Sequence, residues 1–419
     1  MSKKRTLHLL ILAAVVLSLN AVLVSAQSGI SIVHYYSDAL GQETMGGILQ
    51  AFNEGNPDYE VADNSAGHED FKTQILVTIA GDNPPDIFSY WAGARTQFIV
   101  DAERLMPLDD WWAENGLDDV VPAGVKAAGV HNEHIYNVPM NVHVVGFFYN
   151  PKVMEAAGIT EMPATWDEFL TVCETLKESG VTPIALGSRN RWPAQYWFDY
   201  TVSRTAGPES RQQLMAGEAK YDDPEVQAAM EVWKQLVDAG DFVPDANAFD
   251  WDEAANMVAN GDAAMTLMGT WITGLWNSNG LEPVTDYDFF PFPIIDPEIP
   301  EVVHGSIDGW VIAENAKNAE GGKALLAWML SPEVQQTWAI GQGALAASTA
   351  IDQTAYTPVM AKAAEYLAGV DFLSGYDLST TPPMAEGGLD MFAMFMNDAS
   401  GYQDYLAETQ FIAEDVFGG

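Results

Sequence analysis

Four tryptophans stand where a predicted strand ends or a loop turns: Trp91, Trp192, Trp271 and Trp310. The flat face of an indole can stack on another apolar face, such as the C–H face of a sugar ring. Planar polar side chains beside it could then bind hydroxyl groups, and the candidates are His68, Asn141, His143, Arg191 and Asp308. Because an unpaired polar group in a dry site is costly, such a site would discriminate between ligands.

These residues also have plainer explanations. Any one of the polar candidates could lie on the surface or cap a turn. Four other tryptophans fall in amphipathic helical patterns, and we expect them to pack in or near a core: Trp166, Trp233, Trp328 and Trp338.

Motifs for common catalytic chemistries are missing. The sequence has no GxSxG nucleophile elbow, no P-loop and no HExxH helix. Residues 131–134 read His-Asn-Glu-His, and their spacing predicts an exposed hairpin turn rather than a metal site. We therefore expect no catalytic residue, no metal and no cofactor. Two of the 59 acidic residues could still act as a pair on a glycosidic bond, so a carbohydrate-active enzyme stays an alternative.

The charge balance excludes two classes of partner. The chain has 419 residues, of which 18 are basic and 59 acidic, for a formal net charge of −41. Nucleic-acid binders and proteins held on anionic lipid by a basic patch need the opposite balance, so we expect no nucleic acid partner. The single cysteine, Cys173, cannot form an internal disulfide.

The elements that must position these side chains alternate between strand and helix. Predicted strands cover 30–36, 59–61, 86–90 and 142–149, and predicted helices cover 45–53 and 71–80 or begin after Thr165, Asp223 and Ser331. Thr165 and Glu168 have the spacing of a capping box. The alternation indicates an α/β architecture with largely parallel sheets. The length suggests two or three domains, and without a Gly/Ser linker two lobes would be joined by strands.

The N-terminus has the pattern of a secretory signal peptide. Basic residues at 3–5 precede an apolar stretch from Leu7 to Val24. Small residues at the end of the stretch, up to Ala26, have the pattern of a cleavage site. We predict cleavage after Ala26, with a periplasmic or extracellular mature protein. An uncleaved anchor is the alternative, because the stretch approaches the ~20 residues that span a bilayer.

Several segments, in order, resemble one family. They are 51–57, 80–88 with Trp91-Ala92-Gly93, 135–139 with 148–150, 165–169, 268–271 and 308–310. Through them the chain is similar to the extracellular (periplasmic) solute-binding proteins of family 1, the carbohydrate-binding components of bacterial ABC importers. It departs from the family pattern at Thr270, where an Asp is usual, and near 343–346.

The resemblance implies a two-lobed α/β fold, the periplasmic-binding-protein type II fold. Each lobe would hold a mixed sheet flanked by helices, with hinge strands between them. The implied N-terminal lobe covers 27–142 and 305–347, and the C-terminal lobe covers 143–304 and 348–419. The chain would cross between lobes near 141–144, 304–307 and 346–349.

The resemblance also implies a ligand site between the lobes. Its carried-over residues are Tyr36, Trp91, Asn141, His143, Trp192, Trp271 and Asp308, to which we add Glu43, His68 and Trp310.

The expected protein captures its ligand without reacting with it. It would bind a mono- or oligosaccharide by hinge closure, as a monomer, and deliver it to the membrane permease of an ABC importer. The alternatives are the secreted carbohydrate-active enzyme and a polyamine- or peptide-binding protein on the same fold. The strong acidity would suit a cationic polyamine.

Overall fold

A mixed sheet runs through the whole molecule. The computed structural model describes residues 28–418, so the predicted signal peptide and its cleavage site lie outside the described residues. The main path of the sheet is β2 (Tyr59–Ser65), β1 (Ser28–His34), β3 (Ile87–Trp91), β10 (Val302–Ile312), β6 (Val138–Tyr149), β8 (Ala263–Gly269) and β7 (Thr182–Ile184). Off this path, β9 (Asp288–Phe290) and β11 (Leu345–Ala346) pair with β6, and β12 (Asp371–Ser374) pairs with β10.

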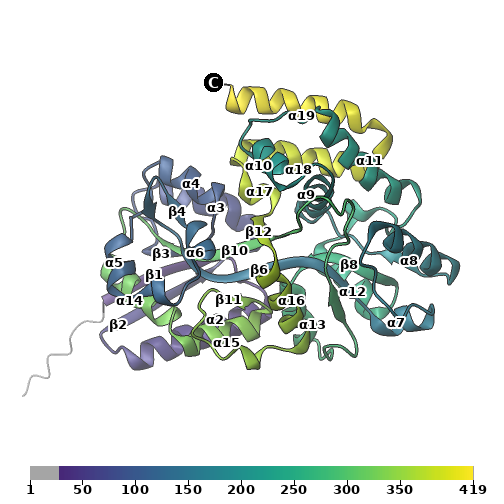
Figure 1. Cartoon of the computed structure of the whole chain (residues 1–419). Helices are drawn as coiled ribbons and strands as arrows, with labels where there is room; N and C mark the ends of the chain where they lie inside the picture. Colours follow the sequence, from purple (N-terminus) through teal and green to yellow (C-terminus); the bar gives the residue numbers. More distant parts are fainter. Residues whose placement is uncertain (1–27, 419) are drawn as a thin grey trace, which may run out of the picture.

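Two long buried strands, β6 and β10, connect the halves of the molecule. The first half of β6 pairs with the second half of β10 in antiparallel register, from Trp310 opposite Val138 to Gly305 opposite Val144. The rest of β6 pairs with β8 and β9 instead, and the first residues of β10 pair with β12. In Figure 1, β6 runs across the middle of the molecule from one lobe to the other.

Two hydrophobic cores lie on either side of this crossing. On β6, Met140 belongs to the first core and Val142 to the second. On β10, Ile307 belongs to the second core and Trp310 to the first. Each long strand therefore leaves one core and enters the other within two or three residues.

Helices cover both lobes. Those of the first lobe are α2 (Ala39–Gly55), α3 (His68–Ala80), α4 (Ala94–Asp101), α5 (Asp109–Glu114), α6 (Ala123–Ala127), α14 (Ala319–Met329) and α15 (Pro332–Gln342). Those of the second lobe are α7 (Pro151–Ala156), α8 (Trp166–Glu178), α9 (Trp192–Thr205), α10 (Pro208–Met215), α11 (Pro224–Asp238), α12 (Trp251–Asn260), α13 (Trp271–Ser278), α16 (Pro358–Gly369), α17 (Tyr376–Ser379), α18 (Pro382–Asn397) and α19 (Tyr402–Phe417). Within residues 28–418, short 3₁₀ turns occur at η1 (Leu117–Asp119), η2 (Ala246–Ala248), η3 (Gln353–Ala355) and η4 (Ala399–Gly401).

The two-lobed α/β fold with a mixed sheet is confirmed, but the expectation of largely parallel sheets is wrong. The centre of the sheet is antiparallel, because β10 runs against both β3 and β6, and β6 runs against β8. Parallel pairing holds for β1 with β2 and β3, for β7 with β8 and for β10 with β12. Alternation along the chain could not reveal this, because the two crossing strands serve both lobes.

Local helix signals are confirmed. Thr165 and Glu168 form the predicted capping box at the start of α8. Asp223 and Ser331 precede the proline-initiated helices α11 and α15. The predicted segment at 45–53 is part of the longer α2, whose N-cap Asp38 accepts a hydrogen bond from the Gly41 amide.

The segment at 131–134 is the predicted hairpin, but one of its histidines is buried. β4 (Val130–His131) pairs with β5 (His134–Ile135), and Asn132 and Glu133 turn the chain with positive φ angles of 48° and 68°. The His131 side chain lies inward, where its Nδ1 is 3.1 Å from Gln97 Oε1. Within residues 28–418, no group of three or more potential ligand side chains is arranged to hold a metal ion. Nor is any helix in this range long and apolar enough to cross a membrane.

Candidate functional site

Aromatic side chains from both lobes form one continuous series, which we call the ring row. Its members, in order, are Tyr36, Tyr35, Trp91, His68, Trp192, Trp271 and His143, with neighbouring ring centroids 4.5, 4.5, 5.3, 6.4, 5.7 and 5.2 Å apart. The row passes from the first lobe to the second between His68 and Trp192.

The first-lobe rings are positioned by two parallel strands. Tyr35 and Tyr36 directly follow β1, and Trp91 is the last residue of the neighbouring β3. Because the carboxyl ends of parallel strands meet at one edge of a sheet, these rings lie together, and Tyr35 stacks on Trp91 with an angle of 6° between the planes. His68, the first residue of α3, completes this half of the row, with its Nδ1 held 2.8 Å from Glu69 Oε1.

The second-lobe rings begin two helices. Trp192 is the first residue of α9, and Trp271 is the first residue of α13, just beyond the end of β8. The Trp271 indole lies against Gly269, where a Cβ would overlap the ring. Glycine at this position therefore lets the indole lie flat on the end of the strand. Tyr196, one turn along α9, is 6.4 Å from the rings of both tryptophans.

Three buried polar side chains on the crossing strands lie next to the ring row, to which one of them, His143, also belongs. We call Asn141, His143 and Asp308 the polar floor. Asn141 stands opposite Asp308 in the β6–β10 register, and its Nδ2 donates to Asp308 Oδ2 at 2.8 Å. His143 Nε2 lies 3.4 Å from the same oxygen. Burial raises the pKa of Asp308, but hydrogen bonds from His143, Asn141 and Tyr35 and the nearby His143 charge outweigh it and hold the pKa below its ordinary value.

Two further residues fix the floor in place. Thr270 Oγ1 is 2.9 Å from His143 Nδ1, so the residue that departs from the family's usual Asp still orients this histidine. Trp338 Nε1 donates to Asn141 Oδ1 at 2.7 Å, and the Trp338 ring meets Tyr36 edge-on at 4.5 Å. Because these partners fix both ends of Asn141, its amide orientation is set before any ligand arrives.

Four residues of this site are absent from the set predicted from the sequence. They are Tyr35, Tyr196, Thr270 and Trp338. Tyr35 adjoins a predicted site residue, and Tyr196 lies one helical turn after Trp192, so both were open to inference from spacing. The helical pattern around Trp338 predicts only that its side chain packs in or near a core. No local signal indicates that its Nε1 reaches Asn141 on the crossing strand β6.

Three candidates do not join the ring row or the polar floor. Glu43 is exposed on α2, and among the described residues no hydrogen bond, ion pair or ring contact joins it to either group. Trp310 is 1% exposed in the first core, where its ring lies 6.1 Å from that of Tyr36. Arg191 forms ion pairs of 2.6 Å with both Glu386 and Asp390 of α18. Trp310 thus backs a ring of the row instead of forming part of it, because its position on β10 faces the core.

The arrangement suits binding more than bond making. It offers flat apolar faces from two lobes and hydrogen-bonding groups that are already oriented. The acidic group at its centre, Asp308, accepts several hydrogen bonds and so is kept ionised instead of poised to donate a proton. A site shared by two lobes that strands connect is the design of a hinged ligand-binding protein.

Comparison with known proteins identifies the family to which this chain belongs. Residues 38–336 match the family described as bacterial extracellular solute-binding protein. This match spans well over half of the chain, so the chain belongs to the bacterial extracellular solute-binding proteins, as the resemblance predicted. Membership implies a secreted or periplasmic protein.

Two distant relatives match most of the chain. An uncharacterised ABC transporter extracellular-binding protein of Pyrococcus horikoshii is 28% identical over 95% of this chain and 92% of its own length. The xylose/arabinose-binding protein XacG of Haloferax volcanii is 24% identical over 87% of this chain and 78% of its own. Among solved structures, the bacterial solute receptor AcbH superposes with a TM-score of 0.87 at 23% identity, over 94% of this chain and 100% of that one, which supports the fold.

Proposed function

We propose that this protein is the substrate-binding component of a carbohydrate ABC importer and binds a mono- or oligosaccharide at the ring row. The observation that carries the proposal is the passage of the row from one lobe to the other beside the polar floor. Indole faces suit the C–H faces of a sugar, and the fixed amide, imidazole and carboxylate suit its hydroxyl groups. Trp91, Trp192 and Trp271 would stack on the ligand, and Asn141, His143 and Asp308 would orient it.

The named ligands of similar proteins support this class of ligand. XacG is named as a xylose/arabinose-binding protein. AcbH is described as having an exclusive substrate preference for β-D-galactopyranose. All three named ligands are monosaccharides, the size that a few stacked side chains can cover.

The proposed mechanism is a shift between two arrangements of the lobes. The lobes would be 27–142 with 305–347 and 143–304 with 348–419, close to where β6 and β10 exchange cores. A sugar that contacts both halves of the ring row favours the state in which they meet, in proportion to its differential affinity. The protein, a monomer released by cleavage after Ala26, would then pass the sugar to a membrane permease.

A thermal-shift panel tests the proposal. The panel contains pentoses, hexoses, short oligosaccharides, spermidine and a short peptide, and an aryl glycoside is assayed separately for hydrolysis. Saturation at 100 times Kd adds ~2.7 kcal/mol to the unfolding free energy, so a true ligand should raise Tm clearly. A rise with a saccharide alone, without hydrolysis, supports the proposal. A rise only with spermidine or the peptide, release of product from the aryl glycoside, or no rise with any saccharide would overturn it.

A further inference from the structure

A four-residue helix of the second lobe reaches into both cores. α17 follows β12, and its Tyr376 belongs to the second core while its Leu378 belongs to the first. The backbones come unusually close here, because a Cβ on Gly93 of the first lobe would lie 2.5 Å from Leu378 O. Gly93 has a φ of 100°, which glycine adopts without strain. The contact therefore joins the two lobes outside the covalent crossings.

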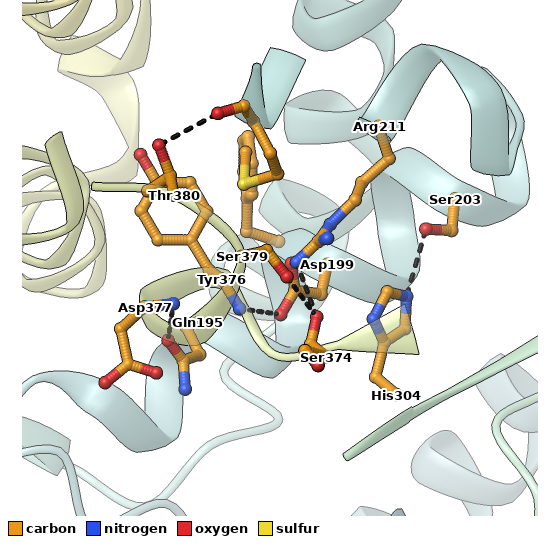
Figure 2. A network of polar contacts seen from close by, with 12 residues as sticks. Gln195, Asp199, Ser203, Arg211, His304, Ser374, Tyr376, Asp377, Ser379 and Thr380 are labelled. Atoms are coloured by element: carbon orange, nitrogen blue, oxygen red, sulfur yellow. Dashed lines mark hydrogen bonds and ion pairs between the residues drawn. The ribbon is translucent and has the colours of Figure 1, made fainter. Parts of the chain in front are cut away.

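A buried polar network fixes α17 to the second lobe. Asp199 of α9 accepts hydrogen bonds from the Tyr376 amide at 2.8 Å and from Arg211 at 2.7 and 3.0 Å. Arg211 also donates to Ser374 O at 2.9 Å. Figure 2 shows these side chains converging on the segment that leads into α17. The position of α17 is thus set by its own lobe.

A buried arginine of the first lobe adds polar contacts to α17. Arg95 of α4 donates from Nε to the Asp377 carbonyl and from a terminal nitrogen to Asp377 Oδ2, both at 3.1 Å. The two side chains are 6% and 9% exposed, so water screens the pair little. The Asp377 amide donates in turn to Gln195 Oε1 at 2.9 Å, which orients the aspartate from its own side.

The position of Arg95 in its own helix does not favour a cation. Arg95 is the second residue of α4, where the helix dipole disfavours a cation. It is compensated from the other lobe by Asp377, and it also lies over the Trp91 ring, 5.6 Å from the ring centroid. One side chain therefore contacts both a member of the ring row and the opposite lobe.

We propose that Arg95 and Asp377 form an interlobe tie, a positioning pair that keeps the two halves of the ring row together although neither residue belongs to the row. The tie is made in the same state in which His68 and Trp192 meet across the lobes. Losing one partner leaves the other charge buried and unpaired, which disfavours that state relative to one with the lobes apart. The inference rests on the proposed function in so far as it predicts sugar affinity.

The test compares Arg95→Met with the wild-type protein. Calorimetry gives Kd for a saccharide found by the panel, and small-angle X-ray scattering gives the radius of gyration without ligand. We expect Kd to rise about tenfold or more and the ligand-free radius to increase. Arg95→Lys, which keeps the charge but not the two-pronged contact, should recover part of the affinity.

The control is Arg204→Met. Arg204 is a buried arginine whose ion pair with Glu301, at 3.3 Å, lies within the second lobe. This variant should lower Tm but leave Kd and the ligand-free radius at wild-type values. If Arg95→Met does not fold, Asp377→Asn replaces it, with the same expected direction.

Failures of the two proposals are distinguishable. Wild-type protein that binds no saccharide overturns the proposed function, while the ligand-free radii still test the tie. A tie variant that binds sugar within twofold of wild type, or more tightly, overturns the tie and leaves the function standing. An unchanged ligand-free radius in Arg95→Met also counts against the tie.

Discussion

At the scale of single residues, the site depends on where a few rings are placed along the chain. Trp91 ends a strand, and Trp192 and Trp271 each begin a helix, so each indole stands at the end of an element, close to a lobe boundary. The polar floor adds groups that other residues of the protein already hold in place by hydrogen bonds. Asn141, for example, is bonded to both Asp308 and Trp338. A ligand would therefore meet oriented groups and incur little ordering cost.

Replacing either second-lobe indole should weaken binding without unfolding the protein. In Trp271→Ala or Trp192→Ala the stacking face is lost, and we expect Kd for the preferred sugar to rise roughly tenfold or more. Calorimetry measures the affinity, and thermal unfolding monitors the fold. Trp328→Ala is the matched control, because Trp328 packs on the first core and donates to Ile48 O. That control should lose stability but keep its affinity, and unchanged affinity in both site variants would contradict the placement of the site.

At the scale of elements, the β4–β5 hairpin shows how a turn motif can hide a buried group. Its turn residues, Asn132 and Glu133, adopt the positive φ angles that a two-residue hairpin turn requires. The pairing of β4 with β5 places His131 against the first lobe instead of in solvent. Burial, opposed more weakly by the charge of Asp101, lowers the pKa of His131 to about 4.

This buried histidine should make the protein lose stability in mild acid. An unfolded histidine has a pKa of ~6.5, so between about pH 6.5 and 4 the unfolded chain binds a proton that the folded chain does not. The stability contributed by neutral His131 is present above pH ~6.5 and is lost as the pH falls through this window. Tm measured from pH 7 to pH 4 should therefore fall less steeply in His131→Gln than in wild type. Identical slopes in the two proteins would refute the assignment.

At the scale of the whole molecule, electrostatic repulsion between acidic side chains opposes the contacts that hold the fold together. The formal net charge is −41, and the carboxylates that carry it repel one another in any compact state. Against this repulsion stand two hydrophobic cores, the paired crossing strands and the contact of α17 with the first lobe.

Salt should therefore stabilise this protein. The Debye length shrinks from ~30 Å at 0.01 M to ~3 Å at 1 M, which screens repulsion between surface carboxylates. We expect Tm to rise by several degrees as sodium chloride increases across this range, with most of the gain below about 0.2 M. An equal osmolality of sucrose serves as the control for excluded-solute effects, and a Tm that is flat or falling in salt would contradict the prediction.

Much of the architecture could be predicted because its signals are local. The capping box at Thr165, the prolines that open α11 and α15, and the indoles at element ends depend on residues within one or two turns of one another. The antiparallel centre of the sheet could not be predicted in this way. It depends on β6 meeting β10, which lie more than 150 residues apart in the sequence.

Patterns along the chain were enough to predict the family, the alternation of strands and helices, and the types of residue available for binding. Which of these residues meet depends on the packing of distant segments. This packing joined Tyr35 to Trp91 and Trp338 to Asn141, turned Trp310 into the core, left Glu43 in solvent and paired Arg95 with Asp377. The physical reason is that helix and strand signals come from neighbours along the chain, whereas a site between lobes forms from side chains that only the packing of distant segments brings within contact distance.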